Sequence, residues 1–113
     1  MTRTDAHRLD ALSRLADLIH ERRGADPASS YTAKLLDEGV EKCAKKLGEE
    51  AVEAALAGLK GDRDHLTMEA ADVFYHLLVL LEATGVGLDG VMAELDKRSG
   101  TSGLVEKASR KVP

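Results

Sequence analysis

The segment AADVFYHLLVLL, at residues 70–81, most constrains what this chain can fold into. Its apolar side chains point to nearly every side of a helix axis, and a helix that is apolar nearly all round is a buried helix. Asp72 and His76 lie one turn apart in the middle of this segment, and Glu69 extends the same stripe by one turn. A buried carboxylate must be ion-paired, hydrogen-bonded or bound to a metal. We therefore expect polar chemistry inside the protein, on this helix.

The rest of the chain also predicts helices. Ala, Leu, Glu and Lys dominate over β-branched and aromatic residues, and the sequence has no Trp and only one Phe. It shows no strand-like alternation of useful length and no internal repeat. We expect helices over residues 5–23 with Thr4 as the cap, within 29–39 between a Ser cap and Gly39, and over 40–59, 63–83 and 89–97. The predicted fold is all-α, a bundle of four to five helices.

Length and composition limit the organisation and the partners. The 113 residues predict a single domain, ending in a basic tail that contains Gly and Ser from about residue 98. A core of Leu, Ala and Val with few aromatic residues often goes with helix pairing between subunits, so we expect a homodimer or a higher homo-oligomer to complete the bundle. The net charge of −4 gives no general attraction to nucleic acid or to anionic membranes.

The compartment is predicted from what the sequence lacks. No apolar run reaches membrane-spanning length, and the N-terminus has no apolar core of a signal sequence. The lone Cys43 excludes an internal disulfide and fits a reducing compartment. We therefore expect a cytoplasmic protein.

Two acidic pairs lie on two consecutive predicted helices, each pair spaced i,i+3 so that both carboxylates leave one face. The pairs are Glu50 with Glu53 and Glu69 with Asp72, and Glu49 stands beside the first. Gly61 and Asp62 break the chain between the helices, and a short break makes the helices antiparallel neighbours. A single acidic pair is usually a solvated face. Here the buried second helix favours a cluster of four or five carboxylates instead.

Helical periodicity also predicts which faces meet. Glu50 shares the apolar face of its helix with Cys43 and Ala57, whereas Glu49 points outward. Tyr31 and Leu35 are expected to pack inward. A stripe of small side chains would let another helix approach closely, either within the chain or across a dimer. The stripe consists of Ala44, Gly48, Ala51 and Ala55.

Oxygen ligands without a Cys pair or a His cluster suit Mg²⁺, with Mn²⁺ as a substitute. Because Mg²⁺ keeps waters and readily shares itself with substrate phosphates, the cluster indicates phosphate chemistry. A di-iron bundle needs Glu-x-x-His at i,i+3 on two helices. Only Asp72 and His76 come near that pattern, at i,i+4 and on one helix, so we set iron aside.

Basic side chains near the acids are candidates for binding phosphate. Lys34, Lys45 and Lys46 are the candidates in the first half of the chain, although Lys34 is equally a surface lysine. His76 is either a partner of Asp72 or a satisfied core histidine. In the tail, RSGTSGLVEKASRKVP, basic groups and backbone amides suit a phosphate or a ribose, and the alternative is a frayed basic terminus. The tail candidates are Arg98, Lys107 and Arg110.

The acidic segments and their flanks resemble a known family. EEAVE followed by EAAD resembles the EExxE…ExxD signature of the MazG-type all-α nucleotide pyrophosphohydrolases. Five segments resemble, within that superfamily, the phosphoribosyl-ATP pyrophosphohydrolase family of histidine biosynthesis. These segments are SYTAKLLDEG, KKLGEEAVEAALA, EAADVFYHLLVLL, the Gly-Leu-Asp at the start of the fifth predicted helix and RSGTSGLVEKASR. The resemblance covers roughly residues 30–110, and the first helix matches less distinctively.

The resemblance implies Mg²⁺-dependent hydrolysis of phosphoribosyl-ATP to phosphoribosyl-AMP and pyrophosphate by a helical protein that works as a dimer or a higher oligomer. It puts Glu50, Glu53, Glu69 and Asp72 in the metal-ligand positions. Glu49 takes the outer position, where it would assist a ligand or orient the attacking water. Two alternatives stay open. One is a house-cleaning pyrophosphohydrolase that removes pyrophosphate from another nucleoside triphosphate, and the other is a non-catalytic helical dimerisation module.

Overall fold

A computed structural model of the chain describes residues 6–100 and 103–110, and these residues form helices and short connections without a strand. The elements are a 3-10 helix at Ala6–Leu9, α1 at Asp10–Glu21, α2 at Tyr31–Glu38, α3 at Val40–Lys60, α4 at Arg63–Thr84, α5 at Leu88–Ser99 and α6 at Gly103–Ser109. The all-α prediction is confirmed, and the tail contributes the additional short helix α6. The predicted cap Thr4 lies outside the described residues.

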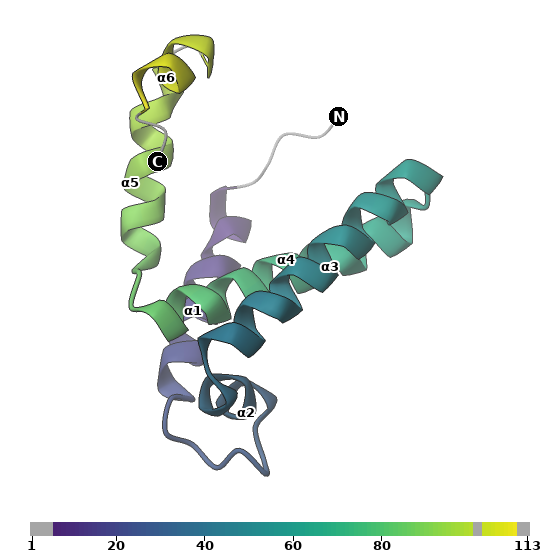
Figure 1. The fold of residues 1–113 in the computed structure, drawn as a ribbon, viewed down its shortest axis with the longest axis vertical. Helices are drawn as coiled ribbons and strands as arrows, with labels where there is room; N and C mark the ends of the chain where they lie inside the picture. Colours follow the sequence, from purple (N-terminus) through teal and green to yellow (C-terminus); the bar gives the residue numbers. More distant parts are fainter. Residues whose placement is uncertain (1–5, 101–102, 111–113) are drawn as a thin grey trace.

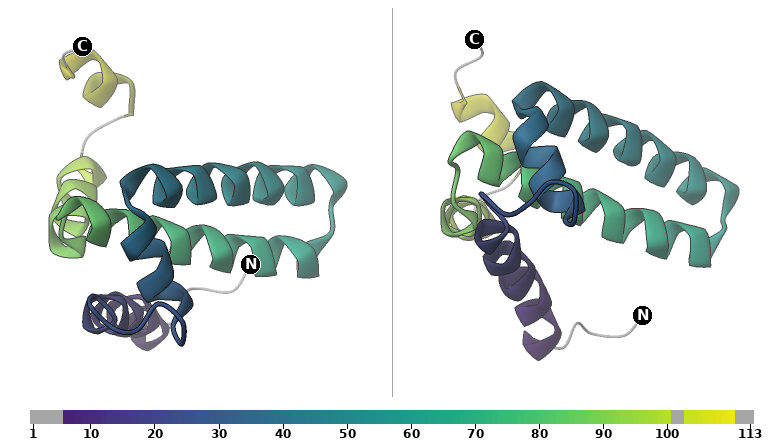
Figure 2. Two further views of the ribbon diagram at one scale, coloured as in Figure 1. Left: turned by 60° about the horizontal axis from the view of Figure 1, so that its bottom comes forward. Right: turned by 90° about the horizontal axis from the view of Figure 1, so that it is seen from below.

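The turn between α3 and α4 sets the geometry of the whole molecule. α3 ends at Gly61, whose φ of 72° lies in the left-handed region that favours glycine. Asp62 then caps α4, because its carboxylate accepts the backbone N–H of His65 at 3.0 Å. This two-residue reversal lays the two longest helices side by side and antiparallel, as both views in Figure 2 show.

The core lies at the open end of this helical hairpin, away from the Gly61 turn. α1 and α2 pack against α3 and α4 there (Figure 1). Four helices contribute to the cluster of buried side chains, which consists of Ile19, Leu35, Cys43, Leu78 and Val79. The thiol of Cys43 donates to the carbonyl of Leu35 at 3.3 Å, which ties α3 to α2 inside the core.

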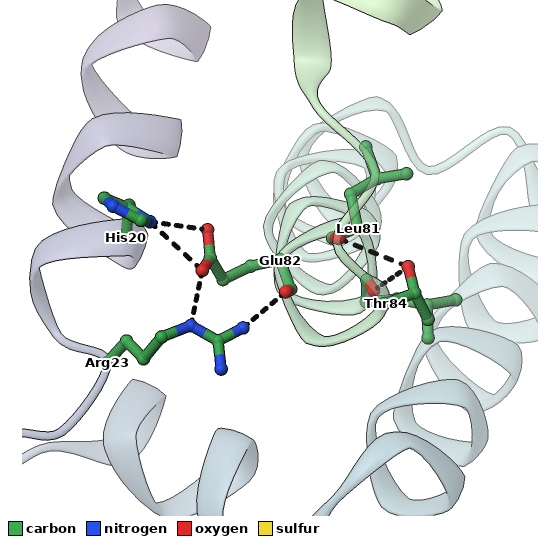
Figure 3. Close-up of polar contacts among 6 residues, drawn as sticks. His20, Arg23, Leu81, Glu82 and Thr84 are labelled. Atoms are coloured by element: carbon green, nitrogen blue, oxygen red, sulfur yellow. Dashed lines mark hydrogen bonds and ion pairs between the residues drawn. The ribbon is translucent and has the colours of Figure 1, made fainter.

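A polar contact fastens the end of α1 to the end of α4 (Figure 3). The Glu82 carboxylate accepts from Arg23 Nε at 2.7 Å and lies 3.1 Å from His20 Nδ1. The Arg23 guanidinium also donates to the Glu82 carbonyl. Burial raises the pKa of Glu82, but the hydrogen bonds from Arg23 and His20 outweigh burial and hold that pKa below its usual range. The sequence analysis gave His20 no role, so this contact was missed.

The helices α5 and α6 lead away from the hairpin and make only sparse contacts with the other helices (Figure 1). Several apolar side chains of this part of the chain are consequently exposed, among them Val86, Met92, Leu95 and Leu104. Within residues 6–100 and 103–110, no single helix has the length and apolar character needed to cross a membrane. Only α4 and α5 together, bent by 113° at their junction, meet that requirement by length and composition.

The prediction that α4 is buried all round holds for only half of its length. His76 and Val79 are buried, but Phe74 is 50% exposed and Asp72 is exposed. The reason is that α1 and α2 pack with the C-terminal half of α4 in the core, whereas its N-terminal half lies beside α3 (Figure 2). The expectation that Asp72 lies inside the single chain is therefore wrong.

Two further packing predictions can be compared with the structure. Leu35 is buried as expected, but Tyr31 is 52% exposed. Tyr31 stands in the first turn of α2, where its ring stacks on Tyr75 with 6.4 Å between centroids instead of entering the core. The stripe of small side chains on α3 is also exposed, so no helix in the described part of the chain packs on it.

Adjacent residues on α1 allow a test of the core. We expect Ile19→Ala to lower the free energy of unfolding by about 2–5 kcal/mol, because it leaves a cavity among α1, α3 and α4. Leu18→Ala is the matched control, since Leu18 is exposed and its replacement should change stability by about 0.5 kcal/mol or less. Urea denaturation followed by circular dichroism measures both, and equal losses would contradict this placement of the core.

The Glu82 contact predicts a specific pH dependence of stability. A carboxylate with a lowered pKa in the folded state stabilises the protein above its unfolded pKa, near 4.5, and this contribution is lost as the pH falls through the folded value. Since Arg23 and His20 are largely exposed, the contribution is about 1 kcal/mol or less. We expect Glu82→Gln to be less stable than wild type at pH 7 and nearly equal to it at pH 3. Denaturant titrations at both pH values measure this difference, and a difference that does not change with pH would contradict the assignment.

Candidate metal centre

Three carboxylates from the two long helices meet at one place. Glu50 on α3 and Glu69 and Asp72 on α4 each offer an oxygen atom, and these oxygens all lie within 4.8 Å of one another. The i,i+3 spacing on α4 and the antiparallel pairing with α3 produce this arrangement. Glu53, one turn along α3, lies near enough for its charge to act on Glu69. The acidic side chains singled out in the sequence are thus neighbours in space.

The negative charges of these side chains are crowded and partly shielded from water. The Glu69 side chain is only 12% exposed. Burial raises its pKa, and the neighbouring Glu50 and Glu53 raise it further, whereas His65 lowers it. Since like charges at this distance repel one another in a partly buried place, a bound cation would relieve the repulsion.

The two oxygens of Glu69 have different surroundings. Oε1 lies 3.2 Å from Nε2 of His65. Oε2 is buried and has no hydrogen-bond partner among the described residues. A buried carboxylate oxygen without a partner is costly unless a cation binds it. Together with the all-oxygen donor set, this atom fits a hard divalent cation such as Mg²⁺ or Mn²⁺.

The outer carboxylate of the EE pair has a separate position. Glu49 is exposed, and its Oε1 lies 3.7 Å from Nζ of Lys46, which also lies 3.8 Å from Glu50 Oε1. The same part of α3 lines a hollow of about 640 Å³ that reaches from Lys46 to Glu53. Its lining therefore combines one ammonium group with three carboxylates, an arrangement in which metal-bound polyphosphate would find partners of both signs.

His76 lies beside the acidic cluster but inside the protein. Its ring makes edge contacts with Tyr75 and Tyr31, at centroid distances of 5.0 and 6.3 Å. Burial lowers its pKa, and the charges of Glu50 and Asp72 act in the opposite direction. Nδ1 is buried without a hydrogen-bond partner among the described residues, so His76 is not a fully satisfied core histidine.

The remaining basic candidates make no ion pair with the acidic cluster among the described residues. Lys34 on α2 and Lys45 on α3 are exposed. Arg98, near the end of α5, donates through Nε to Glu94 at 3.0 Å. Lys107 lies on α6 and Arg110 directly follows it. Since α5 and α6 lead away from the hairpin (Figure 1), the tail residues are not brought to the acidic cluster of their own chain.

Two features of the site were missed in the sequence. His65 contacts a carboxylate of the cluster, and its i,i+4 spacing to Glu69 on one predicted helix was the signal that could have revealed it. The contact between Tyr31 and Tyr75 joins residues far apart in the chain, and no local pattern predicts it.

Known proteins share the sequence that builds this site. Residues 12–99 match the family model described as phosphoribosyl-ATP pyrophosphohydrolase. A protein of Rhodobacter capsulatus named phosphoribosyl-ATP pyrophosphatase is 62% identical over 102 residues, covering 90% of this chain and 99% of the relative. Relatives of the same name from Jannaschia and from Methylobacterium radiotolerans are each 63% identical. They cover 88% of this chain, and 97% and 94% of their own lengths.

The match spans most of the chain, including both helices that carry the acidic cluster and the α2 segment that packs on them. The identity extends over nearly the whole length of the relatives. The chain therefore belongs to the phosphoribosyl-ATP pyrophosphohydrolase family.

Proposed function

We propose that this protein hydrolyses phosphoribosyl-ATP to phosphoribosyl-AMP and pyrophosphate, the second step of histidine biosynthesis. The observation that carries the proposal is the meeting of Glu50, Glu69 and Asp72 between two antiparallel helices. The family and the names of the relatives supply the substrate. The sequence prediction of a pyrophosphohydrolase agrees with the family.

The metal centre is proposed to consist of Glu50, Glu53, Glu69 and Asp72, with Mg²⁺ as the ion and Mn²⁺ as a substitute. Oε2 of Glu69 supports the assignment, because it is buried and has no hydrogen-bond partner among the described residues. These carboxylates would hold a cation that would neutralise charge on the polyphosphate and lower the pKa of a bound water. Without a cation, these carboxylates would repel a triphosphate.

The surrounding side chains are proposed to position the reactants. The reaction adds one water across the bond between the α- and β-phosphates, and the attacking water loses a proton. Glu49 is exposed at the edge of the cluster and is proposed to orient this water or accept its proton. Lys46 holds Glu49 and Glu50 and is proposed to contact phosphate oxygens, with Lys45 and Lys34 as outer contacts. His76 is proposed to support the cluster from the protein side.

Assembly is the second part of the proposal. α3 exposes its stripe of small side chains, and Leu59 on the same helix is 83% exposed. Close approach of a second helix would cover this face and other exposed apolar residues, among them Phe74. We propose a homodimer, or a higher homo-oligomer, built on this face. Arg98, Lys107 and Arg110 are proposed to contact phosphate or ribose in that assembly.

The organisation and the compartment of the protein are also proposals. The chain is proposed to act as a single catalytic domain with a basic tail. Cys43 is free and buried, which agrees with a reducing compartment such as the cytoplasm.

The substrate and the metal are tested together by measuring pyrophosphate release. Phosphoribosyl-ATP and a panel of ordinary nucleoside triphosphates are compared, each with Mg²⁺ and with a chelator. Among these substrates, we expect strong pyrophosphate release only from phosphoribosyl-ATP. This release should require Mg²⁺. Glu50→Gln should lower kcat/KM by at least about 100-fold, because a metal's stabilisation of transition-state charge amounts to several kcal/mol.

Glu21→Gln is the matched control, since Glu21 is an exposed carboxylate on α1, outside the acidic cluster. It should retain the wild-type kcat/KM, and its stability should stay within about 0.5 kcal/mol of wild type. Comparable release from common triphosphates would favour the alternative of a broader nucleotide pyrophosphohydrolase. No release with any substrate, and no effect of Mg²⁺ on stability, would leave the non-catalytic helical module.

The proposed dimer is tested by analytical ultracentrifugation. We expect the wild type to sediment as a dimer or a larger assembly, and Ala55→Arg to shift it toward the monomer, because a long charged side chain prevents close helix packing. Ala28→Arg, in the exposed connection between α1 and α2, is the control and should leave the assembly unchanged. A monomeric wild type at micromolar concentration would contradict the proposal.

A further inference from the structure

One contact at the acidic cluster involves a residue outside the acidic signature. His65 stands in the first turn of α4, and its Nε2 lies 3.2 Å from Oε1 of Glu69. The His65 side chain is 46% exposed, whereas Glu69 is nearly enclosed. The imidazole therefore contacts a carboxylate that also belongs to the cluster with Glu50 and Asp72.

The position of the imidazole is set by the turn that precedes it. The backbone N–H of His65 donates to the Asp62 carboxylate at 3.0 Å, which fixes the first turn of α4. From this turn, the i,i+4 spacing places the His65 ring over the Glu69 carboxylate. The same short segment that reverses the chain thus also places a hydrogen-bond donor at the cluster.

The contact makes the two oxygens of Glu69 unequal. Because an ionised carboxylate only accepts hydrogen bonds, Nε2 of His65 is the donor when Glu69 is ionised. Oε1 is thereby occupied by His65. Oε2 remains buried, without a hydrogen-bond partner among the described residues. A carboxylate held in this way presents one defined oxygen to a cation.

We propose that His65 is a positioning residue for the divalent cation at the acidic cluster. Its Nε2–H holds Oε1 of Glu69 and directs Oε2 toward the metal, without His65 itself binding the metal. The inference rests on the metal centre in the proposed function. Mutation of a residue that hydrogen-bonds a metal ligand typically lowers metal affinity or activity by about 10–100-fold.

The competing explanation is an ordinary helix-surface pair. Such an i,i+4 pair would stabilise the helix slightly and would contribute nothing specific to metal binding. The two explanations differ in what a metal titration of the intact chain shows. They also differ in whether a side chain that keeps the donor restores the function.

The test is a titration of the full chain with Mn²⁺. The electron paramagnetic resonance signal of free Mn²⁺ measures how much of the ion is bound. We expect His65→Leu to weaken Mn²⁺ binding by about 10–100-fold. His65→Gln should restore most of the affinity, because its side-chain amide can donate from a similar position. In steady-state kinetics, His65→Leu should raise the Mg²⁺ concentration needed for half-maximal rate far more than it lowers kcat at saturating Mg²⁺.

His20→Leu is the matched control, because His20 also contacts a carboxylate, Glu82, but far from the cluster along α4. It should leave Mn²⁺ affinity unchanged. Glu50→Gln tests the metal centre itself and should remove the binding. Wild-type binding that does not depend on Glu50 would overturn the metal centre and the role of His65 together.

Glu50-dependent binding that His65→Leu leaves unchanged would overturn the role of His65 alone and leave the proposed function intact. Equal weakening in His65→Leu and His65→Gln would overturn it as well, because the donor would then not be the feature that matters. Circular dichroism of every variant measures whether the helical fold is retained.

Discussion

The antiparallel pairing of α3 and α4 is the constraint on which the rest of the structure depends. The Gly61–Asp62 reversal fixes how far each helix runs past the other, and thus which residues face one another. Toward the turn, this register brings carboxylates together. Toward the open end, it brings Cys43 beside Leu78 and Val79, where α1 and α2 complete the core. One helix pair therefore holds both the stabilising core and the acidic cluster.

The core and the acidic cluster have opposite energetics. Burial of apolar side chains stabilises the open end. In the acidic cluster, burial and the neighbouring carboxylates raise the pKa of Glu69, and the crowded charges oppose compaction. A functional site often retains such strain because its ligand relieves it. The distant core supplies the stability that allows the hairpin to hold like charges together. The Glu82 contact with Arg23 adds a polar fastening at the core end.

Local patterns in the sequence predicted the helices, the Ser cap and the Gly39 end of α2, and the gathering of acids, because all of these depend on spacing within a few residues. The exposure of Asp72 and Tyr31 was not predictable. Periodicity shows which faces are apolar, but not which other helix covers them. Contacts between distant segments, such as Arg23 with Glu82, depend on the tertiary arrangement and leave no local signal.

The buried thiol of Cys43 gives this fold an internal reporter. Burial raises the pKa of Cys43, so the reactive thiolate is scarce while the core is closed. The side chain has no exposed surface, and its neighbours come from α1, α2 and α4. Reaction with an alkylating reagent therefore requires these helices to separate. The rate of that reaction measures how often the core opens, without an engineered label on the protein.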